Sequence, residues 1–383
     1  MSVTAAAGFR AAGATAGLKP SGRPDVALVV NDGPRQDAAA VFTANRCKAN
    51  PVLWSERAMV DGLLAGVVLN SGGANCYTGP EGFQTTHAAA ELVAELIGGG
   101  AFDIAVCSTG LIGDPLDRSR LEDGIRKAAA ELGRHGGAGA AEAIMTTDTR
   151  PKQTVVHGGG WVVGGMAKGS GMLAPALATM LVVLTTDAVA TGATLDRALR
   201  EATRVTFDRL DTDGCMSTND TVLLLSSGAS GVEPTAGELA DAVTKACDDL
   251  ARQLWADAEG SAHEIAIEVV DAATERDAVD AGRAVARSAL FKCAIFGGDP
   301  NWGRVLAAIG TTAAAFDPMS VDITLNGVQV CRNGGIGDPR ELVDLSSRRV
   351  AVTIDLKAGD ASATILTSDL TDDYVHENSA YST

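Results

Sequence analysis

Short apolar runs alternate with helical patterns along most of the chain, and this alternation restricts the fold more than any other feature of the sequence. Residues 26–30, 66–69 and 104–107 are such runs, and each ends in a polar or glycine-rich turn, which is typical of a buried strand. Residues 85–97 and 121–132 follow a helical pattern instead. Strands that alternate with helices predict an α/β protein.

The clearest helix is predicted over residues 238–256. Its apolar side chains recur at spacings of three and four, with Asp and Lys on the opposite face, as in Leu239, Val243, Cys247, Leu250 and Leu254. Residues 133–141, by contrast, are mostly Gly and Ala and carry no apolar periodicity. We therefore expect a surface loop over 133–141 rather than a domain boundary.

The last third of the chain shows strand-like alternation. Residues 321–325 and 328–330 alternate on either side of Asn326-Gly327, which is a strong signal for a two-residue hairpin. Residues 350–356 and 361–366 alternate as well. An antiparallel sheet with one face open to solvent is therefore expected in this part of the chain.

Composition and charge exclude several classes of partner. The 383 residues are 46% hydrophobic and 21% charged, which is typical of a globular protein. The chain has 31 Lys and Arg against 48 Asp and Glu, a formal charge of −17, so its mean field repels phosphate. We therefore expect no nucleic-acid partner and no membrane partner, and no apolar stretch is long enough to span a bilayer.

Cysteine and histidine usage disfavours disulfides, metal sites and common cofactor sites. The seven scattered Cys residues form no C-x-x-C pair, which disfavours disulfides and a zinc ribbon and favours a reducing cytoplasm. No signal peptide is recognisable at the N-terminus. The five His residues show no metal-ligand spacing, and the common cofactor and hydrolase signatures are absent. Neither a metal nor a resident cofactor is expected.

Residues 168–181 are the most unusual stretch, because glycines and Pro175 lead into Thr179 and an apolar run. One interpretation is a Gly/Pro turn that feeds a buried strand, since β-branched Thr suits strands. The other is an internal nucleophile. If the Thr179 hydroxyl attacks the Ala178 carbonyl, an N-to-O acyl shift and hydrolysis would free the α-amine of Thr179. An α-amine has a pKa of about 7.7–8.0, so it can act as a general base near neutral pH without a His.

This stretch resembles the self-cleavage motif of the ornithine acetyltransferase family, also called glutamate N-acetyltransferases. Further blocks match the family in order over essentially the whole chain, at residues 108–113, 145–150, 211–213, 217–220, 259–260, 299–304 and 378–383. The resemblance implies a mixed α+β layered sandwich of the ornithine acetyltransferase type.

The resemblance also implies a maturation step and a reaction. The precursor would be cut between Ala178 and Thr179, giving an α chain of residues 1–178 and a β chain of residues 179–383 that share one core. Thr179 would take the acetyl group from N2-acetyl-L-ornithine, release ornithine, and pass the acetyl group to L-glutamate in a ping-pong cycle of arginine biosynthesis. The implied assembly is a heterotetramer of two α and two β chains. Whether acetyl-CoA also serves as a donor stays open.

Thr109 and Gly110 correspond to the family's oxyanion hole. They follow the apolar run 104–107, at the end of a predicted strand, where a hydroxyl and a backbone N–H can point at a developing alkoxide. From the residues alone an ordinary strand-terminating turn is equally consistent with this pattern.

Substrate-binding positions follow from the resemblance in the same way, and they are Thr146, Lys168, Thr179, Glu259, Asn378 and Thr383. A lone Lys is usually solvated and a C-terminal tail usually frays. A lysine beside a glycine can, however, approach a bound carboxylate closely. Glu259 is expected at the end of the predicted 238–256 helix, where the helix dipole disfavours a carboxylate. The family block usually continues with a Lys, whereas this chain has Ala258 before Glu259 and His263 after it, so His263 is given no role.

Three other functions remain open on the sequence. A related self-cleaving amidohydrolase or aminopeptidase would pass the acyl group to water. A paralogue of secondary metabolism would transfer acetyl groups to a similar substrate. An uncleaved binding protein would use the glycine-rich turn only for its fold.

Overall fold

Two stacked β-sheets form the first of two lobes. The computed structural model describes residues 2–174 and 180–380. Predicted positions Ala178, Thr179 and Thr383 lie outside the described residues. The first sheet has the order β1 (Phe9–Ala14), β2 (Val26–Asn31), β4 (Gly66–Ser71) and β5 (Ile104–Thr109). The second has the order β3 (Ala38–Phe42), β9 (Thr221–Ser226), β8 (Leu181–Thr186), β7 (Val162–Lys168) and β6 (Lys152–His157).

Helices cover the outer face of each sheet. The first sheet packs against α1 (Asn50–Ala58), α2 (Gly79–Ile97) and α3 (Arg118–Ala130). The second packs against α5 (Gly192–Val205) and α6 (Ala236–Ala256). A third core lies between the two sheets. The lobe is therefore the layered sandwich that the resemblance implied, with helices outside and two sheets inside.

Strand β8 shows why the central strands are continuously apolar. Leu181 and Val183 are buried in the core between the sheets, whereas Val182 and Leu184 are buried against α5 and α6. Because successive side chains of a strand point to opposite faces, a strand in the middle of such a sandwich needs apolar residues at every position. Strand β8 is the apolar run that the sequence pattern showed at the end of the glycine-rich stretch 168–181.

The prediction of a surface loop over 133–141 is wrong. Helix α4 (Gly137–Ala143) occupies most of this range, and Ala140 and Ala141 are fully buried in the core between the sheets. Gly136 and Gly13 come so close to neighbouring backbone that a Cβ would collide with it. Gly and Ala thus allow α4 to pack closely against the neighbouring backbone. A search for periodic large apolar side chains does not detect a helix of this kind.

The C-terminal lobe, residues 264–368, is a single mixed sheet. Its order is β13 (Gly335–Ile336), β12 (Val328–Arg332), β11 (Asp322–Leu325), β14 (Arg349–Asp355), β10 (Glu264–Ala272) and β15 (Ala361–Ser368). One face packs on α7 (Glu275–Ala286), α8 (Ala289–Phe296) and α9 (Trp302–Ile309), while Glu268 and Ala351 on the other face are exposed. Asn326 and Gly327, both at positive φ, form the predicted hairpin turn.

The expected antiparallel sheet is confirmed except at one strand pair. Strands β10 and β14 run parallel. The connection between them carries α7, α8 and α9, strands β11 to β13 and the 3-10 helix Arg340–Leu342, and such a crossover is what parallel neighbours require. Alternation along a strand reveals its burial but not the direction of its partner, so this pair could not be predicted.

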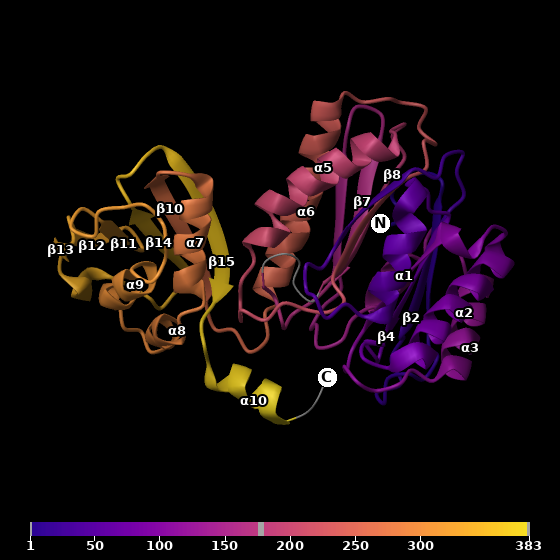
Figure 1. Cartoon of the computed structure of the whole chain (residues 1–383), viewed down its shortest axis with the longest axis horizontal. Coiled ribbons are helices and arrows are strands. Elements are labelled where there is room, and N and C mark those ends of the chain that lie inside the picture. The colour runs from indigo at the N-terminus through magenta and orange to yellow at the C-terminus, as the bar shows by residue number, and fades with distance from the viewer. Residues whose placement is uncertain (1, 175–179, 381–383) are drawn as a thin grey trace.

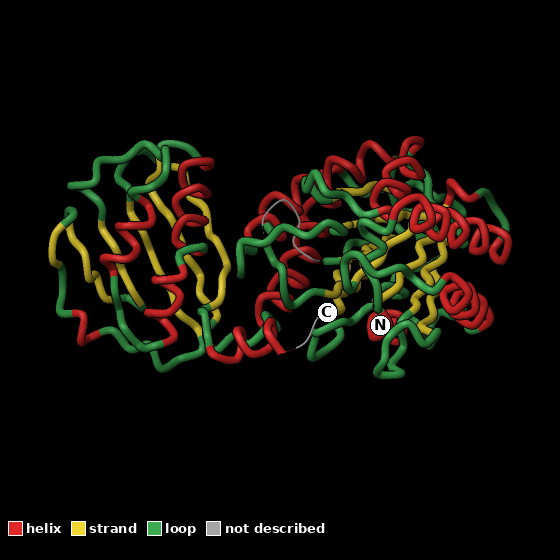
Figure 2. Tube along the Cα trace, turned by 60° about the horizontal axis from the view of Figure 1, so that its bottom comes forward, coloured by secondary structure: helices red, strands yellow, loops and turns green. Residues whose placement is uncertain are grey.

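The C-terminal helix runs from the second lobe toward the first (Figure 1). Helix α10 (Asp372–Ala380) leaves β15 and extends toward the first lobe (Figure 1, Figure 2). Four short 3-10 helices complete the described chain, at Met59–Asp61, Ala101–Asp103, Phe207–Arg209 and Arg340–Leu342. None of the described helices has the length and hydropathy needed to cross a bilayer.

Candidate active site

One small cavity, of about 80 Å³, collects every predicted site residue that the structure describes. Its walls are formed by Thr109, Gly110, Thr146, Thr147, Lys168, Gly171, Met172, Glu259 and Asn378. Six of these residues are predicted positions, and the sequence resemblance supplied their roles, which stay predictions. Thr147, Gly171 and Met172 were not predicted.

Thr109 and Gly110 are held at the end of β5, as their position after an apolar run predicted. The Thr109 carbonyl accepts hydrogen bonds from the amides of Gly72 and Gly73, both at 3.0 Å. Gly110 has φ +132°, and a Cβ there would lie 2.5 Å from the Gly73 nitrogen. Only glycine fits, because this conformation is strained for other residues and the neighbouring backbone leaves no room.

Lys168 ends β7 and is only 2% exposed. Its Nζ donates a hydrogen bond to Thr109 Oγ1 at 3.1 Å. Burial lowers the pKa of this lysine, and the nearby charge of Asp148 opposes that shift. Within the described chain, no carboxylate oxygen lies within ion-pair distance of Lys168 Nζ. The cavity therefore has a buried lysine amino group in its wall.

Glu259 is held by neutral donors. Thr147 Oγ1 donates to Oε1 at 2.7 Å, and Asn378 Nδ2 donates to Oε2 at 3.2 Å. The backbone N–H of Glu259 donates to the Ser170 carbonyl at 3.0 Å. Asn378 comes from α10, so the C-terminal helix contributes directly to the cavity.

The unfavourable position at the end of a helix, which was predicted for Glu259, is occupied by Asp257 instead. Helix α6 ends at Ala256, and its C-cap is Asp257, while Glu259 lies in the loop beyond. A carboxylate at a helix C-terminus is unfavourable unless a cation compensates it. Lys152 does so, since its Nζ lies 2.6 Å from Asp257 Oδ2.

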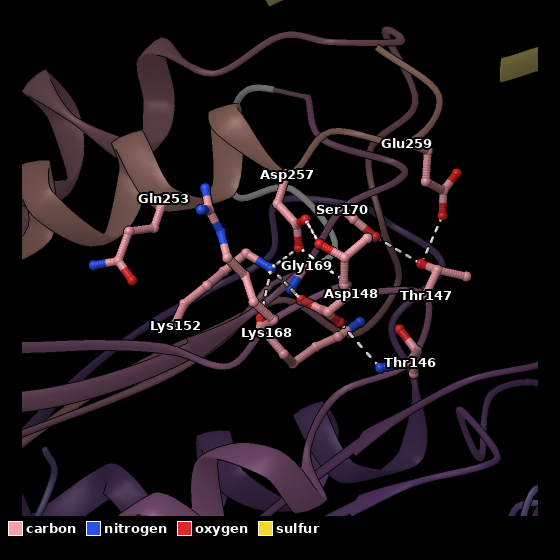
Figure 3. A network of polar contacts seen from close by, with 12 residues as sticks. Thr146, Thr147, Asp148, Lys152, Lys168, Gly169, Ser170, Gln253, Asp257 and Glu259 are labelled. Carbon is pink, nitrogen blue, oxygen red and sulfur yellow. Dashed lines mark hydrogen bonds and ion pairs between the residues drawn. The ribbon is translucent and has the colours of Figure 1, made fainter. Parts of the chain in front are cut away.

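A buried ionic network, drawn in Figure 3, is hydrogen-bonded to the backbone at Thr146 and Gly169. Lys152 Nζ also contacts Asp148 Oδ1 at 2.6 Å, and the side chains of Lys152 and Asp148 are fully buried. Although burial opposes ionisation, Lys168 and Lys152 hold the pKa of Asp148 below its usual value. Sequence reasoning missed this network. Asp148 lies in the Thr-rich block 145–150, but nothing in one sequence places Asp257 beside Lys152.

The comparisons with known proteins identify the family of the chain. Residues 10–383 match the model of the ArgJ family. The chain is 64% identical to the arginine biosynthesis bifunctional protein ArgJ of Streptomyces coelicolor, over 100% of both chains. It is 56% identical to the protein of the same name from Mycobacterium leprae, over 99% of this chain and 95% of that one.

A solved structure with similar sequence is an ornithine acetyltransferase of Mycobacterium tuberculosis complexed with ornithine. It is 53% identical, covers 47% of this chain and 96% of its own, and has a TM-score of 0.45. From the family match and the identity over its full length, this chain belongs to the ArgJ family.

Proposed function

We propose that this ArgJ-family enzyme transfers the acetyl group of N2-acetyl-L-ornithine to L-glutamate, giving L-ornithine and N-acetyl-L-glutamate in arginine biosynthesis. The observation that carries the proposal is the convergence at one cavity of residues far apart in the sequence. The end of β5, the loop at Thr146, the end of β7, the loop at Glu259 and helix α10 all contribute to it.

The proposed nucleophile is Thr179, freed by self-cleavage after Ala178. Its α-amine takes the hydroxyl proton while Oγ1 attacks the acetyl carbonyl carbon. The amide C–N bond then breaks, and ornithine leaves with the proton. The glutamate amine attacks the carbonyl carbon of the acetyl-threonine, the ester C–O bond breaks, and the proton lost by the amine returns to Thr179 Oγ1. Support comes from the strand register, because Leu181 pairs with Lys168 across β8 and β7. The described chain thus resumes, at Met180, next to the end of β7 that lines the cavity.

The other wall residues are proposed to stabilise charge. The Thr109 hydroxyl and the Gly110 N–H would bind the oxyanion of each tetrahedral intermediate. Lys168 would bind the α-carboxylate that both amino acids carry. Glu259 is contacted by neutral donors and would accept the side-chain ammonium of ornithine. Thr146, Asn378 and Thr383 would complete substrate binding.

We further propose, on the family resemblance, a cytoplasmic heterotetramer of α chain 1–178 and β chain 179–383, two of each. No resident cofactor enters the proposed chemistry. The use of acetyl-CoA as a second donor is a separate proposal, which a donor comparison with glutamate as acceptor decides.

A denaturing gel and a transfer assay test the function together. We expect two bands of about 18 and 21 kDa from average residue mass, and a single band at 39.0 kDa for Thr179→Ala. With N-acetylornithine and glutamate, both ornithine and N-acetylglutamate should form. If the wild-type chain stays uncut, the nucleophile is wrong. If ornithine is released equally fast without glutamate and no N-acetylglutamate appears, the enzyme is a hydrolase.

A further inference from the structure

Four charged side chains are buried close together, namely Asp148, Lys152, Asp257 and Lys168 (Figure 3). Lys152 Nζ lies 2.6 Å from one oxygen of each carboxylate, so Asp148, Lys152 and Asp257 form one ionic network. None of these three side chains lines the cavity that holds the predicted site residues. Charges are rarely buried without paired partners, because removing them from water is costly.

The network is bonded to the segments that carry the site residues. Asp148 Oδ2 accepts from the amide of Thr146 at 3.0 Å, and Asp148 Oδ1 accepts from the amide of Gly169, next to Lys168, at 2.7 Å. Asp257 lies two residues before Glu259, and its Oδ2 accepts from the Thr149 amide at 3.1 Å. Asp148 therefore fixes the backbone at Thr146 and next to Lys168, whereas Asp257 holds the backbone of Thr149.

The charges of the network also bear on Lys168. Two carboxylates around one ammonium leave a net charge of −1, and Lys168 supplies the balancing positive charge from a distance. A lysine ammonium has three N–H donors. The one hydrogen bond of Lys168 Nζ in the described chain goes to Thr109 Oγ1. A direct ion pair would have occupied at least one of the two remaining donors, whereas a remote counter-ion leaves both for a ligand.

We propose that the Asp148–Lys152–Asp257 network positions Lys168 and keeps it cationic without a direct ion pair, so that its ammonium can bind the α-carboxylate of the substrate. This inference rests on the proposed function. Asp148 and Asp257 are positioning residues in it, since neither lines the cavity that contains Lys168.

The sign of the effect follows from the groups that face Lys168. Asp148, Glu259 and Asp220 favour its charged form, whereas Lys152 and burial disfavour that form. Lys19, from the loop after β1, is a further positive charge within electrostatic range of Lys168. Removing the negative charge of Asp148 should therefore lower the pKa of Lys168. Removing that of Asp257 should act in the same direction but less strongly, because Asp257 is engaged by Lys152.

The test is the pH dependence of kcat/KM for N-acetylornithine. On the alkaline limb of this profile, kcat/KM falls as Lys168 loses its proton. This limb should be absent in Lys168→Arg, because arginine stays charged. In Asp148→Asn the limb should move to lower pH by about one unit, which equals a tenfold loss of activity on that limb. Asp257→Asn should shift it less and serves if Asp148→Asn does not fold. The matched control is Gln253→Ala. Gln253 bonds both backbone groups of Gln153 on β6 and carries no charge, so it should leave the limb unmoved.

A second measurement does not depend on catalysis. The pKa of Lys168 can be titrated by NMR in protein with ¹³C-labelled lysine ε-carbons, the resonance being assigned by its loss in Lys168→Arg. The proposal is overturned if the Asn variants and Gln253→Ala leave this pKa alike. If the wild-type protein transfers no acetyl group, the proposed function fails, and the NMR titration still decides whether the network keeps Lys168 charged.

Discussion

Gly171 is a single residue on which the shape of the cavity depends. A Cβ at this position would lie 2.3 Å from Glu259 Oε2 and 2.5 Å from Oε1. Such distances are far below van der Waals contact, so any side chain here must displace the carboxylate or the loop. Glycine is needed at 171 because the Glu259 carboxylate occupies that space.

Gly171→Ala should therefore weaken substrate binding while leaving the fold intact. Because a displacement of about 1 Å can cost ~10² in rate, we expect kcat/KM for N-acetylornithine to fall by roughly 10–100-fold. Steady-state kinetics of the purified, self-cleaved variant measures this. Gly159→Ala is the matched control, since a Cβ at Gly159 meets nothing within 4 Å. Equal activity of the two variants would contradict the role of Gly171.

At the residue scale, the site roles came from the family resemblance, and the local pattern predicted only where some of these residues lie on an element. Thr109 and Gly110 could be placed because a strand ends there, and β5 does end at Thr109. Asp148 and Lys152 could not be assigned to the site, because their partner Asp257 lies 105 residues beyond Lys152. Contacts between distant segments depend on the packing of the whole lobe, which no local pattern contains.

Among the elements, α10 is unusual because it carries a site residue without any buried side chain. Its hydrogen bond from Asn378 to Glu259 spans 119 residues of sequence. Helix stability in proteins comes mainly from packing of an apolar face. The helix therefore serves the cavity rather than the core.

Deleting residues 372–383 should separate activity from stability. We expect kcat/KM to fall by ~10², because Asn378 and the predicted Thr383 are lost from a site that requires precise positioning. The thermal unfolding midpoint should change little, since none of the described residues 372–380 has a fully buried side chain. Calorimetry and acetyl-transfer kinetics measure the two effects. Val375→Ala, at a side chain on α10 that is 57% exposed, should retain full activity.

Elements with strong periodicity were predicted well, and the errors have physical causes. Helix α6 spans Ala236–Ala256, close to the predicted 238–256, because its apolar stripe packs on the second sheet. Helix α4 was missed because Ala and Gly pack through backbone proximity. The parallel β10–β14 pair depends on a long crossover and not on the residues of either strand.

At the scale of the whole molecule, hydrogen bonds of Asp211 connect the two lobes. Asp211, in the first lobe, accepts a hydrogen bond from Arg287 Nε at 2.7 Å, just beyond α7. The Asp211 amide also donates to the Leu366 carbonyl of β15 at 2.9 Å. Burial raises the pKa of Asp211 to about 6 despite Arg287. This carboxyl therefore costs stability whenever it is ionised.

The pH dependence of stability follows from this shift. A folded pKa above the unfolded value means that Asp211 stabilises the fold at low pH and loses this contribution as the pH rises through about 6. Between pH 4 and 7 the loss is about 2 kcal/mol from linkage. The free energy of unfolding of Asp211→Asn, relative to wild type, should rise by that amount over this range. Denaturant titrations at both pH values measure it, and a pH-independent difference would contradict it.

The strand order of the second sheet has a consequence for the proposed cut after Ala178. Strands β3 and β7 precede the cut and flank β9 and β8, which follow it. The two products would thus share one sheet, joined by the strand pairs β3–β9 and β7–β8. Apolar cores cover both faces of this sheet. An affinity tag on the N-terminus should retrieve both products at equal molar ratio through any dilution. They should part only in denaturant, because separating them means unfolding the lobe.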